Sequence, residues 1–249
     1  MRLNKKYIHG FGVLLLAGIV LISCEKTFDE KIIQQRDLSA NSIAKVYIAT
    51  VGASRNYVYV DSKPQNGSAL SSGSVFPSTG YGFFVPDGQR DFLIRDTLTL
   101  TTQVPLSFTN VMRGGRNYTI FTYDTISAVK QKTVETAINI PIDTTCRVRF
   151  ANFAYNGLAV TPAVDIVSLG KNEVVATNLQ YTDVTEFIVH PTKIGTEAFQ
   201  VRLAGTSTVL ATSAISILEP KRSYTVVYRG SHRATSGASI RTVSLFLNY

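Results

Sequence analysis

Apolar and polar side chains alternate with a period of two along most of the chain from residue 44 onward. Successive side chains of a β-strand point to opposite faces of the sheet, so this pattern predicts half-buried strands. The alternating runs are rich in the β-branched and aromatic residues that pack well on a pleated surface. The clearest runs are Lys45–Thr50, Tyr118–Tyr123, Phe199–Leu203 and Thr242–Leu247.

Turn-forming residues separate these runs at short intervals. The segment closest to a helix is Val129–Ile138, and its content of Thr and Val favours a strand there as well. We therefore predict an all-β chain from residue 44 onward. The turns fall at Asp87–Gly88, Arg113–Gly115, Asn156–Gly157, Ser168–Asn172 and Glu219–Lys221.

The chain also repeats itself. Three blocks recur in the same order at spacings of 102 to 107 residues, which predicts two copies of one module, at 44–143 and 144–249. With about seven or eight short strands in each copy, we predict two tandem antiparallel β-sandwich modules, immunoglobulin-like or transthyretin-like. The paired blocks are Lys45–Ala49 with Arg147–Ala151, Val85–Arg95 with His190–Arg202, and Gly115–Phe121 with Lys221–Val227.

The N-terminus has the charge order of a signal peptide. Arg2, Lys5 and Lys6 precede an apolar core, residues 11–22, that contains no acid. A membrane-spanning helix needs about 20 apolar residues and a signal-peptide core about 7 to 15, so these twelve residues are too few to span a bilayer. We predict that residues 1–23 are a signal peptide.

The four residues that end with Cys24, Leu-Ile-Ser-Cys, resemble a bacterial lipobox, where the cysteine thiol is diacylated and the preceding peptide is removed. The resemblance implies lipidation of Cys24 and attachment to the outer membrane. Each buried methylene contributes about 0.8 kcal/mol, so several acyl chains would anchor the mature protein firmly. The alternative is an ordinary secretory signal followed by an unmodified cysteine.

Residues 24–43 have the charged, polar composition of a solvated tether. Glu25, Asp29 and Glu30 resemble the acidic surface-export signal that follows the lipidated cysteine in lipoproteins of the Bacteroidetes kind. This resemblance favours the cell surface over the periplasmic face, with a plain hydrophilic spacer as the alternative.

Three segments of the second copy resemble the bacterial envelope domain known as domain of unknown function 4397. In that family an opening Arg-Val-Arg-Phe strand precedes a Pro-x-Val-Asp strand and a late Tyr-Thr-Val strand. The resemblance covers 144–249 well and 44–143 loosely, where only Asn56–Asp61 stands in for the Pro-x-Val-Asp block. It implies a β-sandwich, often in tandem, on secreted or lipid-anchored proteins, with no established activity. The segments are Cys146–Ala154, Pro162–Ile166 and Arg222–Val227.

Charge and cysteine content narrow the possibilities further. Residues 1–23 carry three basic residues and no acid, so their removal lowers the formal net charge from +8 to +5. The basic residues are scattered, which indicates a soluble surface and gives no sign of nucleic-acid binding. Beyond Cys24 only Cys146 remains, so no intramolecular disulfide is expected and the core must supply the stability.

The sequence shows no pattern typical of catalysis or metal binding. His190 and His232 lack neighbouring ligands of the kind that zinc needs, so we predict no metal and no cofactor. No serine lies in a Gly-x-Ser-x-Gly motif, and Cys146 is predicted to be a small buried hydrophobe. We therefore predict that the protein is not an enzyme. A hydrolase stays an alternative, because a sequence does not show which carboxylates meet in space.

One long segment is a candidate binding surface. Residues 62–84 are rich in Ser and Gly and end in Tyr81, Phe83 and Phe84, whose rings suit sugars or peptide backbones. The alternative is that these aromatic residues fill the core. A second, basic candidate is the loop Arg229–Gly237.

Taken together, the sequence predicts a lipid-anchored, non-catalytic protein of the cell envelope that serves as an interaction or scaffold module. The alternative is a surface carbohydrate-binding or adhesive lipoprotein that uses residues 62–84. Envelope proteins and glycans are the candidate partners beyond the membrane. The identity of the ligand and the oligomeric state are left open.

Overall fold

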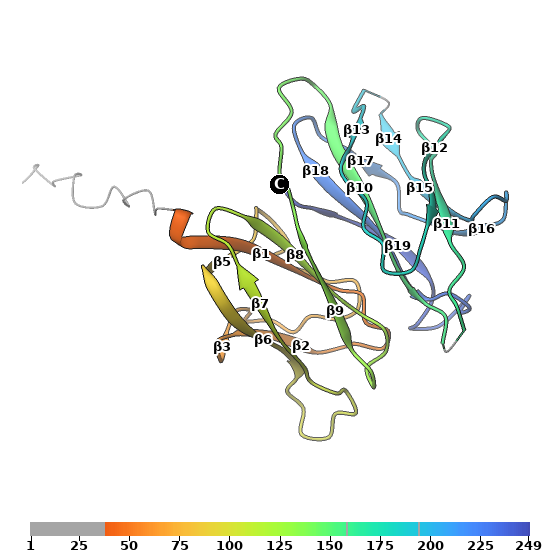
Figure 1. The fold of residues 1–249 in the computed structure, drawn as a ribbon. Coiled ribbons are helices and arrows are strands. Elements are labelled where there is room, and N and C mark those ends of the chain that lie inside the picture. Colours follow the sequence, from red (N-terminus) through yellow and green to blue (C-terminus); the bar gives the residue numbers. More distant parts are fainter. Residues whose placement is uncertain (1–37, 158, 194) are drawn as a thin grey trace, which may run out of the picture. The chain divides into compact units, whose positions relative to one another are not determined.

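Strands form the framework of the chain (Figure 1). The computed structural model describes residues 38–157, 159–193 and 195–249. Within these residues the only helix is the short 3₁₀ turn η2, Leu38–Ala40, which confirms the all-β prediction. No helix among them has the length and apolar character of a membrane span. The predicted signal peptide, Cys24 and most of the predicted tether lie outside the described residues.

The N-terminal half folds into two sheets. In one, β1 lies between β8 and the two short strands β4 and β5, and β9 forms the far edge. The other has the order β3-β2-β6-β7. The first sheet contains β1 Asn41–Ile48, β4 Val75–Phe76, β5 Phe83–Pro86, β8 Asn117–Tyr123 and β9 Lys130–Glu135. The second contains β2 Asn56–Val60, β3 Lys63–Pro64, β6 Gly88–Asp96 and β7 Leu106–Met112.

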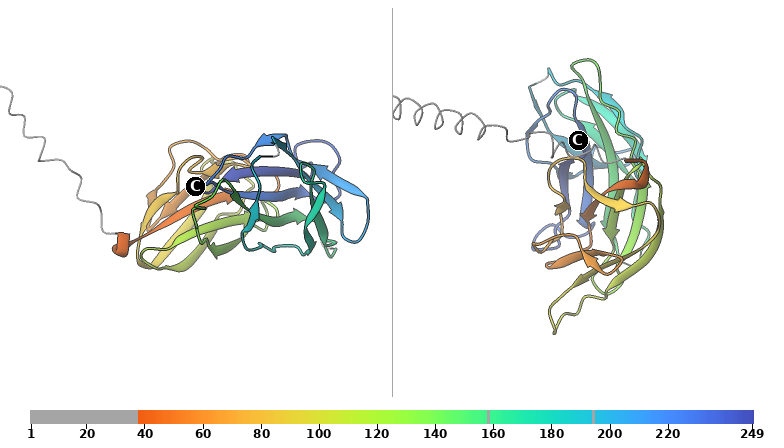
Figure 2. Two further views of the ribbon diagram at one scale, coloured as in Figure 1. Left: turned by 90° about the horizontal axis from the view of Figure 1, so that it is seen from above. Right: turned by 90° about the vertical axis from the view of Figure 1, so that its left-hand side faces the viewer.

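The C-terminal half also has two main sheets, with the orders β13-β10-β18-β19 and β12-β11-β15-β16, and a two-stranded ribbon of β14 and β17. The first sheet contains β10 Cys146–Tyr155, β13 Ile188–His190, β18 Ser223–Ser231 and β19 Thr242–Leu247. The second contains β11 Val164–Ser168, β12 Glu173–Leu179, β15 Phe199–Leu203 and β16 Val209–Thr212. The ribbon is β14 Thr196–Glu197 with β17 Ser216–Ile217. Figures 1 and 2 show the orange-to-green strands of the first half and the green-to-blue strands of the second.

The same order of strands recurs in the two halves. The order β5-β1-β8-β9 matches β13-β10-β18-β19, and β3-β2-β6-β7 matches β12-β11-β15-β16. In each half the first strand runs parallel to a late one, β1 to β8 and β10 to β18, and the other pairs are antiparallel. Alternation of side chains does not reveal strand direction, so the two parallel pairs were not foreseen.

Each half has its own core between its two sheets, as a sandwich requires. Val46 and Ile120 of one sheet pack with Val58 and Phe92 of the other in the N-terminal half. We call β1–β9 the N-terminal sandwich and β10–β19 the C-terminal sandwich, whose own core includes Val148, Phe150, Ile166, Val201 and Val226. Residues 38–249 cluster into one compact unit, so the predicted division into domains at residue 143 stays a prediction.

The first strand begins earlier than predicted. β1 starts at Asn41, three residues before the predicted boundary at 44. Ser42 is fully buried and its hydroxyl donates to the carbonyl oxygen of Val85. A buried polar side chain interrupts the apolar alternation, which is why the sequence pattern missed this end of the strand.

A third apolar cluster joins the two sandwiches. Tyr47 of β1 and Phe121 of β8 pack against Phe153 of β10 and Phe246 of β19. The rings of Phe121 and Phe153 are 4.8 Å apart between centroids, and those of Tyr47 and Phe246 are 5.1 Å apart. The paired strands β1, β8, β10 and β18 are therefore buried on both faces.

A buried arginine also links the sandwiches. Arg149 of β10 donates from Nη2 to the hydroxyls of Thr119 and Thr136, at 2.9 and 3.1 Å, and from Nε to that of Thr225. Its guanidinium lies over the ring of Phe187. Burial lowers the pKa of Arg149 to about 9, and the charge of Glu186 offsets only part of this effect. Three hydroxyls thus satisfy a charge that has no paired carboxylate among the described residues.

Candidate functional site

Residues 62–84, predicted as a long polar loop, are held against the N-terminal sandwich at several points. They include the short strands β3 and β4 and end in β5. Leu70 exchanges two backbone hydrogen bonds with Asn56, and Gly73 N donates to the carbonyl oxygen of Ile48. These hydrogen bonds fix the backbone of the segment against β1 and the start of β2.

The three aromatic residues predicted to bind a ligand do not share one surface. Tyr81 is 41% exposed and stacks on Tyr249, with ring centroids 4.5 Å apart. Phe83 packs against the core and against Phe76, whereas Phe84 is exposed. Phe83 and Phe84 are neighbours on a strand, so they point to opposite faces.

The same segment forms a hollow of about 420 Å³. Its wall combines hydroxyl and amide groups with apolar side chains and carries no charged residue. A volume of this size lies within the range of small-molecule sites, about 300–1,000 Å³. The hollow is lined by Asn66, Gly67, Ser68, Leu70, Ser74, Val75, Phe76 and Ser78.

Asn66 fixes one side of this hollow. Its Oδ1 accepts from Val58 N at 2.7 Å, and its Nδ2 donates to the carbonyl oxygens of Asn56 and Ser68 at 3.3 and 2.7 Å. The side chain is buried and bonded on both ends of its amide. It therefore shapes the wall and holds Gly67 and Ser68 in place.

Two hydroxyls in the wall are available for a ligand. Within the part of the chain that the structure describes, the side chains of Ser68 and Ser78 make no hydrogen bond, whereas Ser74 Oγ accepts from Ser71 N at 3.1 Å. Phe76 and Leu70 supply the apolar part of the wall. The hollow lies within the segment 62–84 singled out from the sequence, but Phe76 was not predicted as part of it, because β4 has only two residues and shows no alternation.

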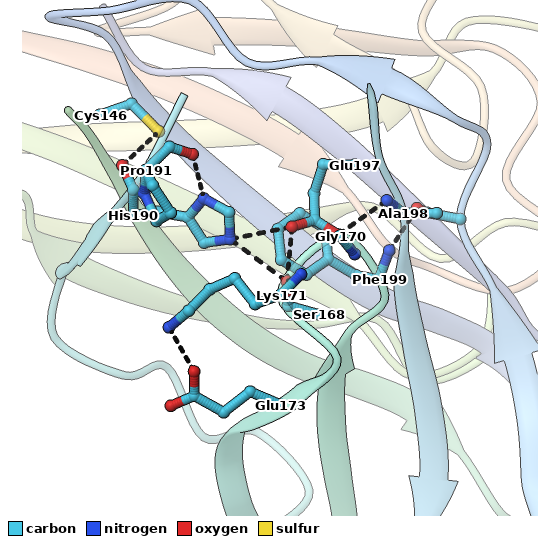
Figure 3. A network of polar contacts seen from close by, with 11 residues as sticks. Cys146, Ser168, Gly170, Lys171, Glu173, His190, Pro191, Glu197, Ala198 and Phe199 are labelled. Carbon is cyan, nitrogen blue, oxygen red and sulfur yellow. Dashed lines mark hydrogen bonds and ion pairs between the residues drawn. The ribbon is translucent and has the colours of Figure 1, made fainter. Parts of the chain in front are cut away.

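A buried polar network in the C-terminal sandwich was not foreseen from the sequence (Figure 3). His190 Nε2 is 3.0 Å from Glu197 Oε2, and Ser168 Oγ donates to that same oxygen at 2.5 Å. Glu197 Oε1 accepts from Gly170 N and Ala198 N, at 3.0 and 2.8 Å. Ser168, His190 and Glu197 are at most 2% exposed.

His190 has polar partners on both ring nitrogens. Its Nδ1 is 2.9 Å from the carbonyl oxygen of Pro191, which only accepts, so Nδ1 carries a hydrogen. Its Nε2 is 3.0 Å from a carboxylate oxygen of Glu197. Serine, histidine and glutamate also form hydrolase triads, but there the serine bonds to the histidine. Here Ser168 donates to Glu197 at 2.5 Å, its contact with His190 Nε2 is longer at 3.4 Å, and burial keeps a substrate away.

Other groups with reactive potential are also enclosed. Cys146 is fully buried as expected, its Sγ donates to the carbonyl oxygen of His190, and burial raises its pKa to about 11. The thiol is thus protonated at neutral pH and a poor nucleophile. His232 lies 3.2 Å from Tyr228 Oη through its Nδ1. No group of three or more His, Cys, Asp or Glu side chains converges among residues 38–157, 159–193 and 195–249.

Comparisons with known proteins add little to this description. No family model and no curated protein matches the chain, so the resemblance to domain of unknown function 4397 stays a prediction. A structure described as alpha-glucan binding by a streptococcal virulence factor is 14% identical and covers 75% of this chain and 92% of its own, with a TM-score of 0.22. Family 41 carbohydrate-binding modules from streptococcal virulence factors are 9% identical and cover 82% and 96%, with a TM-score of 0.24.

A third solved structure comes from Bacteroides thetaiotaomicron VPI-5482. It is described as a candidate polysaccharide-binding protein that contains domain of unknown function 1812. It is 12% identical and covers 83% of this chain and 96% of its own, with a TM-score of 0.24. TM-scores this low do not indicate a common fold, so nothing about the function of this chain follows from these three structures.

A buried lysine beside the hollow-forming segment predicts a pH effect. Lys45 is 2% exposed, and its Nζ donates to the carbonyl oxygen of Pro77 at 3.1 Å. Burial lowers its pKa to about 8. Because the unfolded chain binds this proton more tightly, charged Lys45 opposes folding below pH 8, and the penalty fades as the pH rises toward about 10.4.

We expect Lys45→Met to raise the free energy of unfolding at pH 7 by about 1 kcal/mol, because it removes a desolvated charge and keeps the packing. The gain should shrink at pH 9.5, where the wild-type lysine is largely neutral in the fold. Urea denaturation at both pH values measures the two differences. A variant that is less stable than wild type at pH 7 would contradict the prediction.

Proposed function

We propose that this protein is a non-catalytic, lipid-anchored protein of the cell envelope that binds a neutral saccharide in the hollow lined by residues 66–78. The observation that carries the proposal is the lining itself. Two hydroxyls that have no hydrogen-bond partner among the described residues, those of Ser68 and Ser78, lie beside Phe76 and Leu70 in a hollow whose lining carries no charge.

This lining has the chemistry that a sugar ring needs. The hydroxyls of a sugar both donate and accept, as do those of serine, so Ser68 and Ser78 are suitable partners. The C–H face of a sugar ring packs on apolar and aromatic side chains, here Phe76, Leu70 and Val75. A charged ligand would lose its hydration in this hollow without gaining a charged partner. An uncharged, hydroxylated ligand therefore suits it best.

The buried polar network supports the non-catalytic part of the proposal. Ser168, His190 and Glu197 satisfy one another away from solvent, and burial keeps the Cys146 thiol protonated. We therefore assign these four buried side chains a role in stability.

A single glycine allows a sharp test of the hollow. Gly67 has no left-handed backbone conformation, and a Cβ built there meets no atom within 4 Å. Gly67→Leu is therefore expected to fold normally and to place a bulky side chain in the lining of the hollow. On an array of neutral oligosaccharides, we expect the purified wild-type protein to bind and Gly67→Leu to lose at least tenfold in affinity with an unchanged melting temperature. Ser68→Ala should lose about fivefold, as one hydrogen bond is removed.

Tyr81→Ala is the matched control, because it removes an exposed ring that lies outside the lining of the hollow. Binding that survives Gly67→Leu but is lost in Tyr81→Ala would assign the ligand to the aromatic residues predicted from the sequence. Absence of any bound saccharide would refute the proposed function.

The location is part of the proposal and rests on the sequence around Cys24. We infer attachment through lipid on Cys24 and exposure at the cell surface. Protease treatment of intact cells should then remove the protein while a periplasmic control survives, and Cys24→Ala should release it from the membrane fraction. Protection of the wild-type protein until the outer membrane is opened would place it on the periplasmic face.

A further inference from the structure

The C-terminal sandwich has a hollow of its own, of about 400 Å³. It forms where β16 meets the connection between β18 and β19, next to the basic loop 229–237 singled out from the sequence. Unlike the hollow of the N-terminal sandwich, it has a charged side chain in its wall. It is lined by Leu210, Ala211, Thr212, Thr235, Ile240, Arg241 and Thr242.

Arg241 is fixed in the wall by neutral partners. Its Nε donates to the carbonyl oxygen of Leu210 at 2.7 Å, and its Nη1 donates to that of His232 at 2.9 Å. Among the described residues Arg241 forms no ion pair, and its Nη2 makes no hydrogen bond. The guanidinium is thus held in place with its charge uncompensated and one nitrogen available.

The surroundings reinforce this positive charge. The connection between β18 and β19, residues 232–241, contains no Asp or Glu but includes His232, Arg233 and Arg241. The pKa of His232 is lowered by burial and, to a lesser extent, by the charges of Arg241 and Arg233. Basic groups without a nearby acid attract an anionic ligand and give its charged group a strong hydrogen-bond donor.

The rest of the lining suits a sugar ring. The hydroxyls of Thr212 and Thr235 make no hydrogen bond within the described residues, and both side chains are exposed. Leu210, Ala211 and Ile240 provide apolar surface between them. The hollow therefore combines one fixed cation, two available hydroxyls and an apolar wall.

We propose that this hollow binds an acidic saccharide, with the carboxylate of a uronic acid on Arg241 Nη2 and ring hydroxyls on Thr212 and Thr235. The inference rests on the proposed function, since it assumes that the protein binds saccharides, and it adds a second site with a different ligand class. The N-terminal hollow takes an uncharged unit, and the C-terminal hollow takes a charged one.

Titration calorimetry of the full purified protein tests the inference with an oligoglucuronate, a neutral glucose oligomer of equal length, and inorganic phosphate. Thr235→Glu puts a carboxylate at an exposed position beside Arg241, and Thr235→Gln is its uncharged match. We expect oligoglucuronate to bind at least tenfold more weakly to Thr235→Glu than to Thr235→Gln, because both variants lose the threonine hydroxyl and only the first adds a negative charge. Arg241→Gln should also bind oligoglucuronate at least tenfold more weakly than wild type. Its melting temperature is measured in parallel to check that it folds.

Each outcome separates this inference from the proposed function. The acidic saccharide should still bind Gly67→Leu, because that substitution fills only the N-terminal hollow. Oligoglucuronate binding that is no tighter than that of the neutral oligomer, or that is unchanged in Thr235→Glu, would overturn the inference while leaving the neutral site standing. Phosphate binding as tight as that of oligoglucuronate would show a simple anion site and would also overturn it.

Discussion

Glu197→Ala should lower the free energy of unfolding by about 3–5 kcal/mol, the usual cost of removing one member of a buried charged pair. Glu197 Oε1 accepts two backbone N–H groups, from Gly170 and Ala198, and Oε2 contacts both His190 and Ser168. Alanine leaves four polar groups without their acceptor, three of them on the buried residues Ser168, His190 and Ala198. Urea denaturation at pH 7, followed by far-ultraviolet circular dichroism, measures the loss.

Glu173→Ala is the matched control for this substitution. Glu173, at the start of β12, pairs with Lys171 of the preceding turn at 2.8 Å, but its side chain is 59% exposed (Figure 3). An exposed pair contributes at most about 1 kcal/mol, so this variant should unfold close to wild type. If both glutamate variants lose equally little stability, the buried network does not hold β11, β13 and β14 together as we infer.

Phe121→Ala should cost about 3–5 kcal/mol of stability and should also change how the protein unfolds. Phe121 is fully buried between the sandwiches, with its ring centroid 4.8 Å from that of Phe153 and 6.4 Å from that of Phe246. Its loss opens a cavity in the cluster that joins the two halves, while each sandwich keeps its own core. We therefore expect two separate transitions by calorimetry, where wild type shows one.

Phe84→Ala removes the same side chain from an exposed position and should leave one transition at nearly the wild-type temperature. The double variant Phe121→Ala with Phe153→Ala should lose less than the sum of the two single losses, because the stacked rings contact each other. A single transition in Phe121→Ala, shifted only slightly, would show that the two sandwiches are coupled elsewhere.

Strands could be predicted from the sequence wherever alternation runs for five or more residues. The segment Val129–Ile138, read as a strand despite its helical length, contains β9. Alternation could not show, however, that Tyr47 and Phe121 face a second apolar layer. A side chain turned away from its own core looks the same in a sequence whether water or another sandwich covers it.

The candidate sites were harder to predict because they depend on contacts between distant segments. Ser168 and Glu197 are 29 residues apart, and they meet because β11 pairs with β15 and β14 directly precedes β15. Their positions in the sequence alone therefore do not show that Ser168 and Glu197 both contact His190. In the same way, the hollow around Phe76 depends on Asn66, whose amide bonds to β2 through Val58 and Asn56.

The cluster between the sandwiches sets an order for folding as the chain emerges during synthesis. The Tyr47 hydroxyl bonds with that of Ser244, 197 residues later in the chain, and the Tyr47 ring stacks on Phe246 of the same late strand, β19. The N-terminal sandwich can fold once β9 has been synthesised. The surface that carries Tyr47 and Phe121 stays exposed, however, until β19 has been synthesised and packs against it. For that interval the emerging chain presents an aromatic surface to its surroundings, and contacts so distant in sequence form slowly. A chaperone that shields aromatic surfaces would therefore matter most in the time between synthesis of these two strands.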